Sequence, residues 1–152
     1  PTALRYARRN ATGTAVELVR GDVTDPGLLP ELVGAVDLVV ANPPYIPEGA
    51  VLEPEVAQHD PAHALYGGVD GMSVIVPIAQ RAVHWLAPGG LLAIEHDDST
   101  AQATVALIAA VPFPGSLRSC PPGAFTDITA RRDLTGRPRF VTARRTACEN
   151  NS

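Results

Sequence analysis

The residues that most clearly suggest a chemical function are Asn42, Pro43, Pro44 and Tyr45, which follow the apolar stretch VDLVVA. Proline fixes its own backbone and pushes the preceding residue out of the helical region, so two prolines in succession hold Asn42 and Pro43 extended. The side-chain oxygen of Asn42 and the carbonyl oxygen of Pro43 can then face one point as two fixed acceptors, with the ring of Tyr45 laid across it. This arrangement suits a planar NH2 group, such as an amide or the exocyclic amine of a base.

A planar NH2 nitrogen is a poor nucleophile because its lone pair is delocalised. Two acceptors that bind both of its N–H groups favour a pyramidal nitrogen and stabilise the positive charge that grows as it attacks an electrophile. A preorganised polar group at such a site is typically worth about 3–4 kcal/mol, and alignment of the nitrogen with the electrophile adds more. The motif therefore predicts alkylation of a planar amino nitrogen. The alternative is a rigid loop that only ends a strand.

The segments that must position this motif alternate between strand and helix patterns. The expected helices are residues 1–11, 73–86 and 101–110, the last of them opened by a capping box of Ser99 and Gln102. The expected strands are residues 15–23, 36–41 and 91–95, followed by an antiparallel hairpin of 125–130 and 140–143. This order predicts an α/β fold with a mostly parallel, doubly wound sheet. In such sheets ligands bind at the carboxyl ends of strands, where both Asp22 and Asn42 are expected to lie.

Composition narrows the class of protein. A chain of 152 residues, 45% of them hydrophobic, fits one domain with its own core. The formal net charge of −4 argues against a general nucleic-acid binder. Six arginines near the C-terminus are interpreted as a solvated hairpin surface in preference to a basic interface. Two cysteines are too few for a disulfide framework or a zinc site, which indicates a cytoplasmic protein. No apolar run reaches the roughly 18 residues of a membrane span.

The stretch ANPPYIP resembles the signature of class I S-adenosylmethionine-dependent methyltransferases that act on planar amino nitrogens. The similarity continues through EPEVAQHDPAHALYGGVDGM, LAPGGLLAIEHD and DLTGRPRFVTARR. In that order these segments are similar to the release factor glutamine methyltransferase family, which methylates the glutamine amide in the Gly-Gly-Gln motif of peptide chain release factors. The Asn-Pro-Pro-Tyr motif alone is shared with adenine methyltransferases of DNA and RNA. The loop from Asp60 to Gly71 singles out the glutamine family.

The resemblance implies a role for each matching residue. The substrate amide would be bound by Asn42, Pro43, Pro44 and Tyr45. Of these, Asn42, Pro43 and Tyr45 would be catalytic, and Asn42 would also contact S-adenosyl-L-methionine, the methyl donor. Asp22 matches the acid that accepts from the adenine amino group, and Val23 matches the residue that packs beside the adenine ring. The implied partner is a peptide chain release factor, with no metal, no membrane and no direct nucleic-acid contact expected.

The chain departs from the family pattern at its start. The glycine-rich loop that holds the methionine end of the cofactor is absent, as are the acid for the ribose hydroxyls, the first two strands and the N-terminal helical domain. Those strands would lie between the strand ending at Asp22 and the strand ending at Asn42, so both are expected to lose hydrogen-bond partners and apolar cover. We therefore expect residues 1–145 to be the C-terminal portion of a catalytic domain that does not methylate by itself, and 146–152 to be a disordered tail.

Two other functions stay open on these grounds: an adenine-amino methyltransferase acting on DNA or RNA, and a catalytically silent, truncated binding protein. Three lesser signals have plainer interpretations. Residues 95–98, Glu-His-Asp-Asp, alternate between opposite faces of a strand and are expected to be helix-entry charges, not metal ligands. His59 and Asp60 are expected to form a loop salt bridge or to be exposed. The Gly67–Gly71 segment is expected to be a turn before a helix and not a phosphate cradle.

Overall fold

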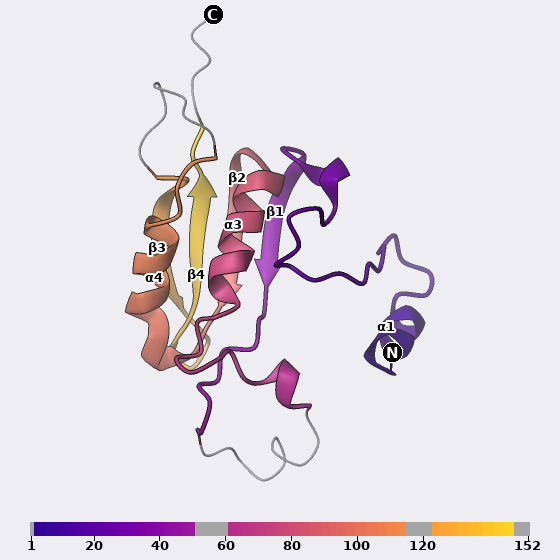
Figure 1. Ribbon diagram of the computed structural model, residues 1–152, viewed down its shortest axis with the longest axis horizontal. Helices are drawn as coiled ribbons and strands as arrows, with labels where there is room; N and C mark the ends of the chain where they lie inside the picture. Colours follow the sequence, from indigo (N-terminus) through magenta and orange to yellow (C-terminus); the bar gives the residue numbers. More distant parts are fainter. Residues whose placement is uncertain (1, 51–60, 115–122, 148–152) are drawn as a thin grey trace, which may run out of the picture.

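A four-stranded mixed sheet forms the centre of the computed structural model, which describes residues 2–50, 61–114 and 123–147 (Figure 1). The sheet order is β1-β2-β4-β3. The strands are β1 (Val36–Ala41), β2 (Leu86–Glu95), β3 (Phe125–Arg132) and β4 (Pro138–Arg145). β1 and β2 run parallel, whereas β2 with β4 and β3 with β4 are antiparallel. The predicted α/β class and the C-terminal hairpin are therefore confirmed.

Two helices cover one face of this sheet (Figure 1). They are α3 (Ile75–Trp85) and α4 (Ala101–Ala109), close to the predicted spans. Pro77 is the third residue of α3, within the first turn, where a missing N–H removes no intrahelical hydrogen bond. Three short 3₁₀ turns complete the described elements: η1 (Pro30–Leu32), η2 (Ala62–Ala64) and η3 (Asp98–Thr100). Within the described ranges, no helix is long and apolar enough to cross a membrane.

The core lies between the helices and the sheet, and β2 alternates across it. Leu92 and Ile94 are fully buried against Ile75 of α3 and Ile108 of α4. Full burial of one such side chain contributes about 1.5–3 kcal/mol. The other face of the sheet is less covered, since Val40 of β1 keeps 71% of its surface exposed. The buried residues hold β2 against the helices, and β1 pairs with β2 in parallel.

The predicted strand at residues 15–23 is wrong. The described chain there is an extended loop that connects α1 (Thr2–Asn10) to η1, and its apolar residues Val16 and Val19 are 60% and 50% exposed. An extended segment becomes a strand only when a neighbour pairs with its backbone. Among the described residues, no strand pairs with this segment. α1 agrees with the predicted helix, buries no residue and lies apart from the sheet (Figure 1).

The predicted capping box of Ser99 and Gln102 is also wrong. The residue before α4 is Thr100, and its side chain makes no capping hydrogen bond. Asp97 caps the preceding turn η3 instead, because its carboxylate accepts from the backbone N–H of Ser99 at 2.9 Å and from the Ser99 hydroxyl. In a capping box, the backbone N–H of Ser99 would donate to the side chain of Gln102. The side chain of Asp97, two residues before Ser99, accepts from this N–H instead.

This cap predicts a pH dependence of stability. Burial acts to raise the pKa of Asp97, but the hydrogen bonds from Ser99 outweigh it and the pKa lies below its usual value. The stabilisation is therefore present above the unfolded pKa and is lost as pH falls through the lower folded pKa. Asp97→Asn keeps an acceptor oxygen but does not titrate. In urea unfolding at a series of pH values, we expect the stability advantage of the wild type to shrink below about pH 4. A constant difference would contradict this.

The end of the described chain is attached to the sheet. Thr146 is buried, its N–H donates to the carbonyl oxygen of Ala124 at 2.9 Å, and its hydroxyl donates to that of Gly123 at 2.9 Å. Residues 148–152, most of the predicted tail, lie outside the described residues. The division of the chain at residue 145 stays a prediction.

Candidate functional site

The Asn-Pro-Pro-Tyr segment leaves the sheet at the carboxyl edge of its parallel pair. Ala41 ends β1 and pairs with Ile94 of β2, so the two strands finish side by side. Asn42 is exposed, Pro43 is buried and Tyr45 is half-buried. The segment is therefore anchored by a proline ring while the amide of Asn42 and part of the Tyr45 ring remain accessible.

A backbone clamp holds the segment after Tyr45. The N–H of Ile46 donates to the carbonyl oxygen of Leu65 at 2.9 Å, and the N–H of Gly67 donates back to that of Ile46 at 2.9 Å. The N–H of Glu48 donates to the carbonyl oxygen of Gly68 at 2.9 Å. The first two bonds form a short parallel bridge between the two loops, and the third extends the contact. Backbone bonds of this kind fix position without depending on side-chain rotamers.

Two glycines allow the clamp to close. A Cβ on Gly67 would lie 2.5 Å from the carbonyl oxygen of Pro44, and one on Gly71 would lie 2.2 Å from that of Tyr45. Gly71 also has a positive φ of 73°, which favours glycine. Gly68 has a φ of 86°, and the N–H of Gly71 donates to its carbonyl oxygen at 3.3 Å. The expected turn before α3 is thus confirmed, and it also packs against the motif. His59 and Asp60 lie outside the described residues.

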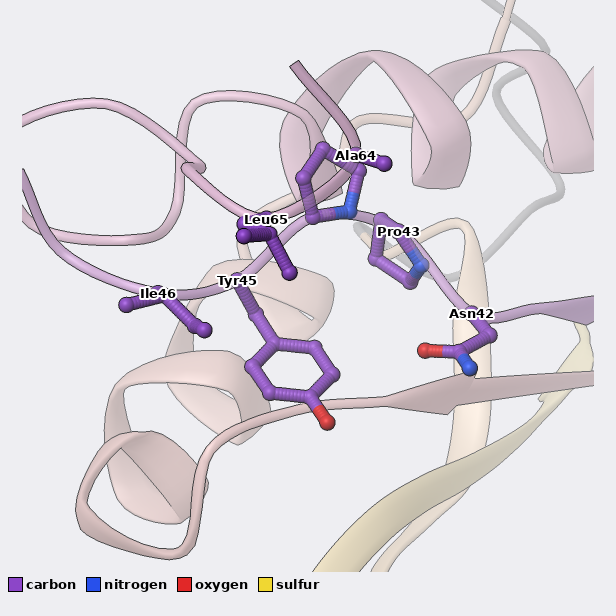
Figure 2. A pocket seen from close by; sticks show the side chains of 7 residues that line it. Asn42, Pro43, Tyr45, Ile46, Ala64 and Leu65 are labelled. Atoms are coloured by element: carbon purple, nitrogen blue, oxygen red, sulfur yellow. The ribbon is translucent and has the colours of Figure 1, made fainter. Parts of the chain in front are cut away.

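A cavity of about 210 Å³ opens between the motif and the loop that clamps it (Figure 2). It is lined by Asn42, Pro43, Pro44, Tyr45, Ile46, Ala64 and Leu65. Figure 2 shows the amide oxygen of Asn42 directed toward the ring of Tyr45. Pockets for drug-sized ligands are typically about 300–1,000 Å³, so this cavity matches a smaller group. A single side-chain amide is small enough to enter it.

Glu95, the last residue of β2, fixes the far end of the tyrosine. The Tyr45 hydroxyl donates to the Glu95 carboxylate at 3.0 Å. Burial raises the pKa of Tyr45 and the Glu95 carboxylate raises it further, against a smaller opposing effect of Arg139. The phenol therefore stays protonated and remains a donor at neutral pH. The sequence interpretation treated Glu95 only as a helix-entry charge. Its position at the end of the strand beside β1 was the signal that could have linked it to the motif.

Asp22 and Val23 lie at a second, wider cavity of about 770 Å³. Asp22 accepts from the N–H of Thr24 at 2.9 Å and from its hydroxyl at 2.8 Å, and these bonds lower the pKa of Asp22. Val23 packs against the core. Pro44 lines both cavities, so the motif forms a wall between them. An ionised acceptor beside an apolar side chain fits an adenine with its amino group. Its pairing with Asn42 as a cofactor site stays a prediction.

Residues 95–98, at the end of β2 and directly after it, form no metal-binding cluster. His96 is fully buried, with its Nδ1 2.7 Å from the carbonyl oxygen of Asp97, while Glu95 is turned to Tyr45. Across the part of the chain that the structure describes, no three His, Cys, Asp or Glu side chains are placed to hold a metal ion.

The mixed sheet, with a parallel pair ending in Asn-Pro-Pro-Tyr and an antiparallel hairpin behind it, defines part of a class I methyltransferase-like fold. A release factor glutamine methyltransferase from Mycolicibacterium smegmatis is 62% identical over 147 residues, 97% of this chain and 48% of that protein. Proteins of the same name from Mycobacterium tuberculosis and Mycobacterium leprae are 62% and 55% identical over 94% and 95% of this chain, which is 43% and 48% of those proteins. The chain matches a C-terminal part of the release factor glutamine methyltransferase family. It spans about half the length of the curated relatives it matches.

Two further similarities were found, one to a curated protein and one to a solved structure. A 4-amino-L-phenylalanine/4-methylamino-L-phenylalanine methyltransferase from Streptomyces pristinaespiralis is 52% identical over 95 residues, 62% of this chain and 32% of that protein. Among solved structures, a possible exported protein from Bordetella parapertussis aligns with a TM-score of 0.48 at 19% identity, covering 97% of this chain and 51% of that one. No family model matches the sequence.

Proposed function

We propose that the Asn42–Tyr45 site serves the methylation of the glutamine side-chain amide of peptide chain release factors, with S-adenosyl-L-methionine as methyl donor, in the cytoplasm. The observation that carries this proposal is the small cavity that Asn42 and Tyr45 share at the carboxyl edge of the parallel strands. The relatives named release factor glutamine methyltransferase support the choice of substrate.

The residues of the site act on the amide nitrogen. The side-chain oxygen of Asn42 and the carbonyl oxygen of Pro43 accept its two N–H groups, Pro44 keeps their backbone extended and the ring of Tyr45 stacks on the amide plane. S-adenosyl-L-methionine, when bound, supplies an electrophilic methyl group. As the new N–C bond forms and the bond between the methyl group and the donor's sulfonium sulfur breaks to leave a neutral thioether, positive charge grows on the nitrogen. This charge strengthens both hydrogen bonds, so the acceptors stabilise the transition state more than the ground state. The nitrogen then loses one proton to solvent.

The relative from Streptomyces pristinaespiralis supports the chemical part of the proposal. Its name places the methylated nitrogen on an aromatic ring, where the lone pair is delocalised as in an amide. The glutamine side chain and 4-amino-L-phenylalanine each have an NH2 group on a planar conjugated system, and they share little else. The Asn-Pro-Pro-Tyr site of this chain suits such a group, and the choice of the molecule that carries it then depends on residues around the site.

A hybrid protein tests the function. The part of the Mycolicibacterium smegmatis relative that this chain does not match would be fused to this chain and incubated with labelled cofactor and either a release factor or RNA and DNA. We expect label on the glutamine of the release factor, located by peptide mass spectrometry. Label on adenine would instead establish the alternative nucleic-acid methyltransferase. No label on any substrate, from a folded hybrid, would favour the silent binding protein.

We expect the 152 residues alone to bind S-adenosyl-L-methionine weakly and not to methylate. Asp22 and Val23 supply contacts for the adenine end, but the sequence has no glycine-rich loop for the methionine end. The lost contacts leave the cofactor held at one end of an open cavity. Titration calorimetry of the isolated chain should show no micromolar binding. A micromolar dissociation constant would refute this expectation.

A further inference from the structure

We propose that Glu95 is a positioning residue that acts through Tyr45: it holds the tyrosine ring in place and makes the ring face a better acceptor of positive charge. The inference rests on the proposed function, because it assigns Tyr45 the amide as its stacking partner. Neither the motif nor the family resemblance assigned a role at the site to Glu95.

The backbone of Glu95 is held rigidly by the sheet. It ends β2, and it pairs with Phe140 of β4 on the side away from β1. Tyr45 lies on a proline-stiffened loop, and its hydroxyl reaches across to the carboxylate at 3.0 Å. The ring is therefore held at both ends, by the clamped backbone on one side and by its hydroxyl on the other. A side chain held at two points loses the freedom to tilt, which preserves a productive stacking geometry.

The surrounding charges leave the carboxylate available to the phenol. Arg139 of β4 lies near enough to Tyr45 to lower its pKa, but it is shared with Asp133, whose carboxylate is 3.8 Å from the Arg139 Nε, and it also lowers the pKa of Asp97. Burial and the bond to Glu95 prevail, and the pKa of Tyr45 is raised overall. The phenol oxygen thus remains a proton donor to an anionic acceptor.

The hydrogen bond has an electronic consequence for the ring. A phenol that donates to a carboxylate carries more electron density on its oxygen and ring than one that donates to water. The ring face attracts cations through its quadrupole, and this attraction strengthens when water is excluded. The nitrogen that acquires the methyl group becomes positively charged beside that face. Loss of the Glu95 bond should therefore slow methyl transfer more than it weakens substrate binding.

A titration of the isolated chain tests the bond without any enzymatic assay. The ultraviolet absorbance change of wild type minus Tyr45→Phe isolates the ionisation of Tyr45 from that of Tyr6 and Tyr66. Glu95→Gln should lower the pKa of Tyr45, though not to its ordinary value, since burial remains. Glu48→Gln, the same charge change at an exposed loop residue, should leave it unchanged. An unmoved pKa in Glu95→Gln would overturn the proposal.

Kinetics of the hybrid protein test whether Glu95 acts through Tyr45. Glu95→Gln and Tyr45→Phe should each lower kcat about 10-fold with KM for the release factor within about twofold, and the double variant should be no slower than either single one. If the kcat of the double variant falls by the product of the two single losses, Glu95 acts elsewhere and the proposal is overturned. Full activity of Glu95→Gln would overturn it as well. A hybrid that methylates nothing would count against the proposed function alone, and the titration would still decide the role of Glu95.

Discussion

Replacing Asn42 with alanine is expected to lower kcat for glutamine methylation by about 10²–10³-fold in the hybrid protein, the effect of removing one preorganised polar group from a transition state. The reason is geometric. The Asn42 amide is directed toward the Tyr45 ring at the cavity mouth, and its oxygen is one of the two acceptors that the planar NH2 group needs (Figure 2). With only the Pro43 carbonyl left, the nitrogen can rotate and its lone pair stays conjugated.

The same variant should fold normally, because Asn42 is exposed and no described hydrogen bond of its side chain supports the fold. Its thermal unfolding midpoint should match that of the wild type within about 1 °C. Asn10→Ala, the same change at an exposed residue of α1, is the matched control and should leave kcat unaltered. Less than a threefold loss of kcat in Asn42→Ala would show that the amide does not orient the substrate.

The elements that could be predicted from the sequence are those whose partners lie within the same chain. β1 and β2 have alternating or continuous apolar residues, and α3 supplies the helix that covers both. The hairpin of β3 and β4 is local, with a turn in which Asp133 accepts from the N–H groups of Thr135 and Arg137. Local periodicity is sufficient where each segment can bury its apolar side against a neighbour that is present.

Residues 15–23 show why periodicity alone fails. Their alternation describes which face would be buried in a sheet, but a strand also needs a paired backbone, and that partner is a property of the fold and not of the segment. The position of Asp22 at a strand end was consequently wrong, although Asp22 still lies at a cavity bordered by the motif.

The residues of the proposed site were assigned from the motif and their roles stay a prediction, whereas the contacts that support them were not predicted. The two prolines determine the local backbone, so Asn42 and Tyr45 could be assigned from the motif itself. The hydrogen bond from Tyr45 to Glu95 joins residues 50 positions apart, and the bridge between Ile46 and Tyr66 joins two loops. The first contact follows from the parallel register of β1 and β2 and the second from the meeting of two loops, and no single segment encodes either of them.

Gly71→Ala is expected to lower the free energy of unfolding by about 2–6 kcal/mol, in two parts. A left-handed backbone costs a non-glycine residue about 1–3 kcal/mol, and relieving a steric clash costs about 1–3 kcal/mol more. The clash is with main chain, since the added Cβ would lie 2.2 Å from the carbonyl oxygen of Tyr45. A carbonyl cannot rotate away as a side chain can, so the clamp must open or the turn must move. Urea unfolding followed by circular dichroism measures the total.

Gly136→Ala separates the two parts. Gly136 has a φ of 85°, and no atom of the described residues comes within 4 Å of the added Cβ, so this variant carries the backbone strain without the clash. It should therefore lose only about 1–3 kcal/mol. Hydrogen exchange locates the remainder: Gly71→Ala, unlike Gly136→Ala, should deprotect the N–H groups of Ile46 and Gly67, which join the motif to its clamp. Equal losses in both variants, with these two amides still protected, would mean that the Gly71 turn does not hold the Asn-Pro-Pro-Tyr segment in place.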